Sequence, residues 1–126
     1  DLHVEVPPVD YDALSGPQEG ESSAAVYRRV AAAREIQQRR YAGSGILCNA
    51  RLTAAQQREF CALSPAADRL MRAAFDRMGL SARAWGRVLR VSRTIADLAG
   101  SDRIEPEHLS EAIQYRSLDR KARYDL

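Results

Sequence analysis

The pattern of apolar and polar residues has two different periods along this 126-residue chain. At the start, Leu2, Val4 and Val6 alternate with polar residues, a period of two that predicts a strand, and a Pro-Pro pair then ends it. A lone strand needs hydrogen-bonding partners, so we expect them to lie in sequence outside this chain, or the strand to be disordered. The residues up to 23 are rich in Gly, Pro, Ser and acids, which is typical of a linker.

Beyond the linker the apolar residues recur at spacings of three and four, the rhythm of amphipathic helices. The first helix is predicted from about residue 24 to 41, with Ser22 or Ser23 as its cap. Its inward face is expected to comprise Val26, Val30, Ala33 and Ile36. Thr53 and Gln56 have the spacing of a capping box, which predicts a short helix running toward Cys61.

The second half of the chain contains three further start signals. Ser64 followed by a proline opens a helix that Gly79 ends, and this helix is expected to turn four residues inward: Leu70, Ala74, Phe75 and Met78. Ser81 caps the longest helix, expected to reach about Ala99. Pro106 lies in the first turn of the last helix. Apolar stripes are predicted on these two helices at Ala84, Trp85, Val88, Leu89, Val91, Ile95, Leu98, Leu109, Ala112 and Ile113.

These elements predict an all-α fold, a small helical bundle with an extended N-terminal arm. We expect three parts: an arm and linker over residues 1–23, a helical domain over residues 24–116, and a charged tail over residues 117–126. Because the chain opens at Asp1 with a partnerless strand, we expect it to be a piece of a longer protein.

Charge narrows the set of partners. Nineteen basic and seventeen acidic residues give a net charge of +2, too close to neutral to make nucleic acid the first expectation. Lys121 is the only lysine, so eighteen of the basic residues are arginines, which grip carboxylates and phosphates with two hydrogen bonds. A genome biased toward Ala and Arg codons is the simpler explanation for this preference.

The usual catalytic and metal-binding motifs are absent from the sequence. Cys48 and Cys61 are isolated, which favours reduced, half-buried thiols over a metal site, and His3 and His108 are expected to be ordinary exposed residues. There is no GxxxxGK[ST] phosphate loop, so the chain is not expected to be an enzyme by itself. No apolar run reaches the roughly 20 residues of a membrane helix, and we expect a cytoplasmic protein without membrane contact.

One group of residues merits a functional hypothesis. Arg83, Arg87 and Arg90 share one face of the longest helix, apart from its apolar stripe. Such a row is most often a solvated helix face. Arg83 differs because it lies in the first turn, where free backbone N–H groups help to bind phosphate. Arg87 and Arg90 are better suited to pairing with acids of neighbouring helices.

The order of these motifs resembles the C-terminal domain of magnesium-chelatase-like AAA+ ATPases, in the branch related to competence proteins. The resemblance is carried by "VAAAREIQQRRY", "CNARLTAAQQREFCAL", "LSARAWGRVLRVSRTIADLAG" and "IEPEHLSEAIQYR", which cover most of residues 26–116. The opening "DLHVEVP" is similar to the strand that ends the ATPase core of this family. Trp85 departs from the family pattern, in which a smaller aromatic residue is expected.

The resemblance implies a helical lid that packs over nucleotide held by the missing AAA+ core of the same chain. ATP and Mg²⁺ are then the cofactors of the full-length protein, in a homo-oligomeric ring that is commonly a hexamer. By position Arg83 resembles the sensor 2 arginine that reaches the γ-phosphate, with Arg87 and Arg90 as possible interface residues. The competence branch is associated with DNA handling, and the chelatase branch with metal insertion into porphyrin.

Four alternatives remain open at this stage. The chain is either the lid of a DNA-processing ATPase, the lid of a magnesium-chelatase subunit, or a free-standing helical module that binds DNA through its longest helix. A plain protein-interaction bundle, in which the arginine row docks an acidic partner, is a further alternative.

Overall fold

The computed structural model describes residues 2–17 and 20–116. The helices are α1 (Tyr11–Ser15), α2 (Ser23–Arg40), the 3₁₀ turn η1 (Asn49–Arg51), α3 (Ala54–Phe60), α4 (Pro65–Met78), α5 (Ala82–Leu98) and α6 (Pro106–Gln114). Within those residues there is no strand, so the expected all-α fold with an extended arm is confirmed.

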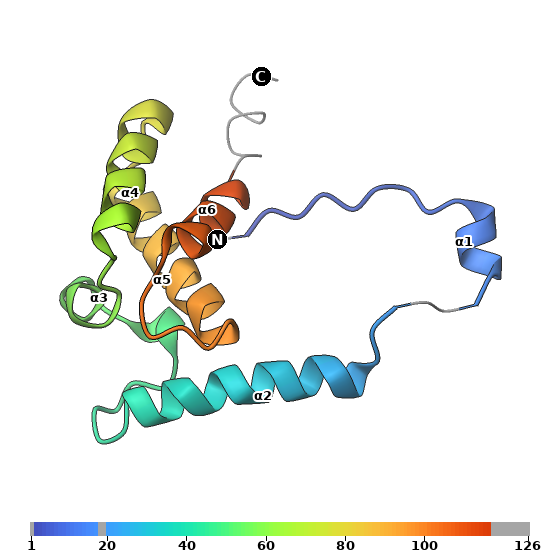
Figure 1. Cartoon of the computed structure of the whole chain (residues 1–126), viewed down its shortest axis with the longest axis horizontal. Coiled ribbons are helices and arrows are strands. Elements are labelled where there is room, and N and C mark those ends of the chain that lie inside the picture. Colours follow the sequence, from blue (N-terminus) through green and yellow to red (C-terminus); the bar gives the residue numbers. More distant parts are fainter. Residues whose placement is uncertain (1, 18–19, 117–126) are drawn as a thin grey trace.

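Helix α5 is the centre of the bundle. It packs against α6, α2, α3 and η1, and α4 packs against α6 (Figure 1). The core that these helices share is apolar and buried; its members are Tyr41, Leu52, Cys61, Ala67, Met71, Val88, Leu89, Ala96, Ile104, Leu109 and Ala112. An isolated parallel bridge between Leu63 and Ile104 ties the loop before α4 to the loop before α6.

The cap residues expected from the sequence set most of the helix ends. The side chains of Ser22, Ser64 and Ser81 accept hydrogen bonds from the backbone N–H three residues later. Thr53 and its partner three residues on form the expected capping box. Gly79 ends α4 with a φ of +60°, a left-handed conformation that suits glycine.

Two expected faces are corrected by the structure. On α2, Val26 and Val30 are 38% and 47% exposed, because this half of the helix extends beyond the edge of the bundle (Figure 1). On α4, Phe75 is 40% exposed, whereas Ala67 and Met71 are buried in its place. Both expectations rested on helical periodicity, which says which residues share a face but not how far the neighbouring helices reach.

The N-terminal region also differs from expectation. Residues 10–23 were expected to be a linker, yet they contain α1, whose cap Asp10 accepts a hydrogen bond from the Ala13 N–H at 2.8 Å. Residues 2–9 are extended without forming a strand, and the His3 N–H donates to the Tyr115 carbonyl oxygen at 3.1 Å. The expected tail, residues 117–126, lies outside the described residues.

His108 was expected to be exposed, and this is wrong. It is 6% exposed, and its Nδ1 accepts a hydrogen bond from the Glu105 N–H at 3.0 Å. Glu105 is the N-cap of α6, so the two residues form a capping box with histidine in the place usually taken by Glu or Gln.

Candidate functional site

The free N-terminal end of α5 carries the residue with the strongest functional hypothesis. The Ser81 Oγ accepts a hydrogen bond from the Ala84 N–H at 3.1 Å and so fixes the first turn. Arg83 is the second residue of the helix, and it is exposed. The first N–H groups of a helix have no acceptor within it, so the backbone there also favours an anion. This end of α5 therefore presents an exposed cation and free backbone donors together.

The other two arginines of the row lie in different surroundings. Arg87 and Arg90 are half-buried, and Arg90 lines a groove of about 400 Å³ between α5 and α6. The groove is mostly apolar, and Leu2 and Val4 of the N-terminal arm also line it. The three arginines therefore differ in their surroundings. Arg83 is exposed at the helix end, whereas Arg90 lies in the groove that the N-terminal arm also lines.

A second hollow, of about 570 Å³, lies between α4 and α5 beside the same helix end. Ala82 and Trp85 line it from α5, and Asp68, Arg72 and Asp76 line it from α4. Arg72 is the only cationic side chain among these lining residues, and it is already paired: its Nε donates to an Asp68 carboxylate oxygen at 2.9 Å. Two carboxylates around an already paired arginine do not favour a phosphate, so any anion at this end of α5 faces Arg83 and not the hollow.

A buried polar network, which was not predicted from the sequence, joins α5 to α2. Asp97 has a side chain with 0% exposure, and its carboxylate accepts hydrogen bonds from Arg40 of α2 and Arg93 of α5. The Arg40 Nη1 lies 3.0 Å from Asp97 Oδ2, and the Arg93 Nε lies 3.2 Å from Asp97 Oδ1. Arg93 also donates to the carbonyl oxygens of Ser101 and Asp102, at 2.7 and 3.0 Å.

Asn49, buried in η1, extends this network to the loop after α2. Its Nδ2 donates to Asp97 at 2.9 Å and to Thr94 Oγ1 at 3.0 Å, and its Oδ1 accepts from the Tyr41 hydroxyl at 2.5 Å. Its backbone N–H donates to Gln37 Oε1 at 3.0 Å. The network therefore fixes α2, η1 and α5 in one arrangement.

The sequence offered one clue to this network, since Arg93 and Asp97 are four residues apart on one helix. The other partner, Arg40, is 57 residues away from Asp97, and no periodicity connects the two.

The surroundings shift three pKa values within this region. The hydrogen bond to Asp97 raises the pKa of Arg40, which keeps the guanidinium charged. Burial raises the pKa of Tyr41, against the opposing effect of Arg40. Burial raises the pKa of Cys61 to about 11, so this thiol is protonated at neutral pH. Cys48 and Cys61 are both free thiols, Cys48 half-buried and Cys61 buried.

Residues 2–17 and 20–116 contain no cluster of three or more His, Cys, Asp or Glu side chains placed to hold a metal ion. Nor does any helix in this part of the chain have both the length and the apolar character needed to cross a membrane.

Comparisons with known proteins place the chain in a family. The family described as "Magnesium chelatase, subunit ChlI C-terminal" matches residues 20–116. Competence protein ComM of Haemophilus influenzae is 40% identical over 121 residues. Uncharacterized protein YifB is 43% identical in Escherichia coli and 42% identical in Salmonella typhimurium, each over 121 residues. Each alignment covers 95% of this chain and 23% of the relative.

The chain therefore spans less than a quarter of the length of these relatives. The family match includes α2 and every later helix among the described residues. The chain belongs to the magnesium chelatase ChlI C-terminal family, the helical lid domain of magnesium-chelatase-like AAA+ ATPases.

Proposed function

We propose that Arg83 senses nucleotide: its guanidinium contacts the γ-phosphate of ATP held by the core of the same AAA+ protein. The observation that carries the proposal is the difference in exposure along the row, since Arg83 is exposed at a free helix end while Arg87 and Arg90 are half-buried. The guanidinium of arginine donates two hydrogen bonds to a phosphate, and free N–H groups of the helix end add to this attraction. Arginine therefore binds a phosphate here better than the single amine of a lysine would.

The position of Arg83 lets the lid respond to hydrolysis. While ATP is intact, charge-assisted hydrogen bonds from the guanidinium hold the lid against the nucleotide. Hydrolysis splits off the γ-phosphate, and Arg83 loses its acceptor, so the lid is released. When bound, Mg²⁺ neutralises phosphate charge during this reaction, and its ligands are assigned to the core and not to this domain.

The buried network supports this response mechanically. Asp97 accepts from Arg40 and Arg93, which ties α5 to α2 and to the loop before α6. A movement of Arg83 at one end of α5 is therefore passed to the helices that pack along it, and the lid moves as one body.

For the full-length protein we propose an ATPase that assembles as a homo-oligomeric ring, a hexamer, and acts in DNA processing. Support for the DNA role comes from one relative, which is named a competence protein. Ring size is measured by analytical ultracentrifugation with ATP, and the DNA role by stimulation of ATP turnover on adding duplex or branched DNA. Turnover that DNA leaves unchanged contradicts the DNA role but not the nucleotide-sensing role.

The test of Arg83 is ATP turnover by the full-length protein with Arg83→Ala and, as the matched control, Arg87→Ala. We expect Arg83→Ala to lower kcat by roughly 100-fold, as for removal of a donor to transition-state charge, with the lid still folded. Arg83→Lys keeps the charge but loses the fork, so it should recover only part of the rate. Circular dichroism checks that each variant remains helical. Equal turnover in the two alanine variants would refute the assignment.

A further inference from the structure

The first half of α2, residues 23–32, carries an apolar stripe that nothing in the described structure covers. Val26, Val30, Ala33 and Gln37 recur at spacings of four, three and four, so they share one face of the helix. Ala33 and Gln37 are each 4% exposed against the bundle, whereas Val26 and Val30 are 38% and 47% exposed. The face that packs on the bundle therefore continues past its edge, as Figure 1 shows for the helix as a whole.

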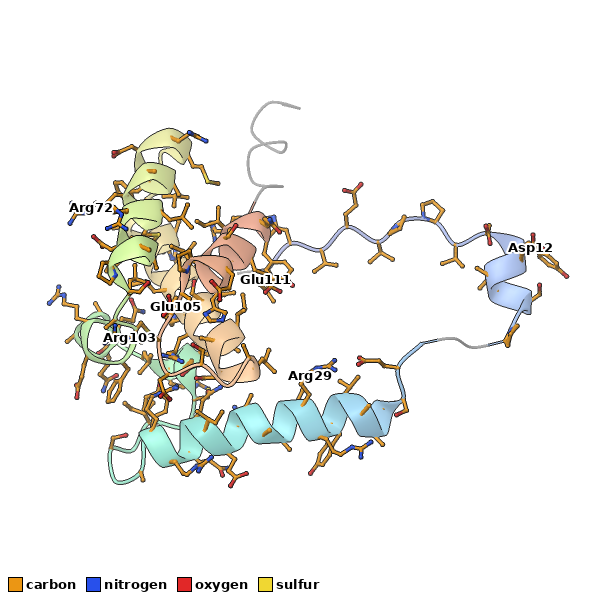
Figure 2. The ribbon with its side chains drawn as sticks, in the orientation of Figure 1. Asp12, Arg29, Arg72, Arg103, Glu105 and Glu111 are labelled. Atoms are coloured by element: carbon orange, nitrogen blue, oxygen red, sulfur yellow. The ribbon has the colours of Figure 1, made fainter. Side chains whose placement is uncertain are left out.

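The polar residue on this side of the helix is already neutralised. Arg29 donates two hydrogen bonds to the Glu21 carboxylate, at 2.8 and 2.9 Å, and Figure 2 shows Arg29 on the side of α2 that faces the arm. The surface available to a partner is therefore apolar, and the charge of the neighbouring Arg29 is already paired with Glu21. Ten residues of helix without tertiary packing are also marginal in water, which favours a partner that covers them.

The sequence of α2 argues against a second copy of this helix as the partner. The helix has five arginines and a single glutamate; the arginines are Arg28, Arg29, Arg34, Arg39 and Arg40. Arg29 and Arg40 are paired with Glu21 and Asp97, but symmetric pairing of two such helices still brings the other arginines close together, which is unfavourable. DNA is a poor fit as well, because Val26 and Val30 offer it no hydrogen bonds.

The relatives indicate a different partner. The aligned region is 23% of each relative, so most of the polypeptide lies outside this domain. In Figure 1 the N-terminal arm leaves the bundle beside α6 and extends on the side where the first half of α2 overhangs, and it too has exposed apolar residues, Val4, Val6 and Val9. Exposed apolar surface on two segments that extend from the same side of the bundle fits a single large partner.

We infer that residues 23–32 of α2, through Val26 and Val30, form the surface on which the ATPase core of the same polypeptide docks. This inference rests on the proposed function, since it requires the core to be part of the full-length protein. It assigns the core to the overhanging half of α2, on a different face of the lid from the hollow between α4 and α5.

The experiment is site-specific thiol labelling in the full-length protein, with Val30→Cys and, as the matched control, Ala32→Cys. Both positions are exposed in this domain, and they lie on roughly opposite faces of α2. A polar maleimide is added, and the labelling rate of each site is followed by mass spectrometry, which separates it from Cys48 and Cys61. We expect the cysteine at 30 to react at least roughly tenfold more slowly, because the docked core must open first. Equal rates at the two sites overturn the inference.

Cross-linking from position 30 then identifies the partner. A photoreactive maleimide at this cysteine should yield cross-links to the core within one polypeptide, unchanged on dilution. Cross-links that form only between polypeptides and disappear on dilution overturn the inference in favour of a second copy, and protection that requires added DNA overturns it in favour of DNA. Turnover of Arg83→Ala is a separate readout: normal turnover with a protected position 30 leaves the docking surface standing and removes only the sensor role.

Discussion

Replacing Asp97 with alanine should destabilise the domain far more than any exposed ion pair does. The substitution leaves Arg93, whose side chain is 3% exposed, and Arg40, at 17%, without their shared carboxylate. Removing one partner of a buried pair typically costs about 3–5 kcal/mol, since a charge is left unpaired in the interior. Arg40 has some access to water, so we place the loss near the lower end, at about 3 kcal/mol.

The matched control is Asp68→Ala, because Asp68 also pairs with an arginine four residues away on its own helix. That pair is exposed, at 50% for Asp68 and 78% for Arg72, and its loss should cost at most about 1 kcal/mol, including the favourable position of Asp68 in the first turn. Urea unfolding followed by circular dichroism at the helix band gives both free energies of unfolding. If Asp97→Ala loses no more stability than Asp68→Ala, the network does not hold α2 on α5 and the reasoning is wrong.

Two further predictions concern the backbone and the buried thiol. Gly79→Ala should lower stability by roughly 1 kcal/mol in urea unfolding, because φ is +60° there although the space around it is open. Burial raises the pKa of Cys61 from 9.0, the value in the unfolded chain, to about 11. The buried neutral thiol therefore stabilises the fold fully at pH values below the unfolded pKa, and this stabilisation is lost as the pH rises toward 11. The stability of the native chain relative to Cys61→Ala should therefore fall by roughly 1 kcal/mol between about pH 8 and 10, and a constant difference would contradict this.

The features that the sequence predicted well are decided by residues near one another in the chain. Ser64 and Ser81 each bond to an N–H three residues later, and Gly79 ends α4 by its own backbone conformation. Such signals need no knowledge of the rest of the fold. The same holds for Arg83, whose place in the first turn of α5 follows directly from its distance to the cap.

The features that were missed depend on what lies across the fold. Periodicity placed Val26 and Phe75 on inward faces, but only the arrangement of the other helices decides where the bundle ends. The partnership of Arg40 with Asp97 joins positions 57 residues apart, and it appears only when α2 is packed on α5. His108 was misjudged because histidine is rarely the N3 residue that closes a capping box, where Glu or Gln is usual.

The hydrogen bonds of Arg93 also bear on which basic residue each position tolerates. Its three nitrogens donate to three acceptors, one side-chain oxygen and two carbonyl oxygens, which a planar guanidinium reaches at once. The single amine of lysine has no such fork, so exchange of Arg93 for lysine strands acceptors inside the protein. Arg34, by contrast, is exposed, so a lysine there strands no buried acceptor. A codon bias toward arginine is thus free to act at positions such as Arg34, whereas at Arg93 the fold itself requires the residue.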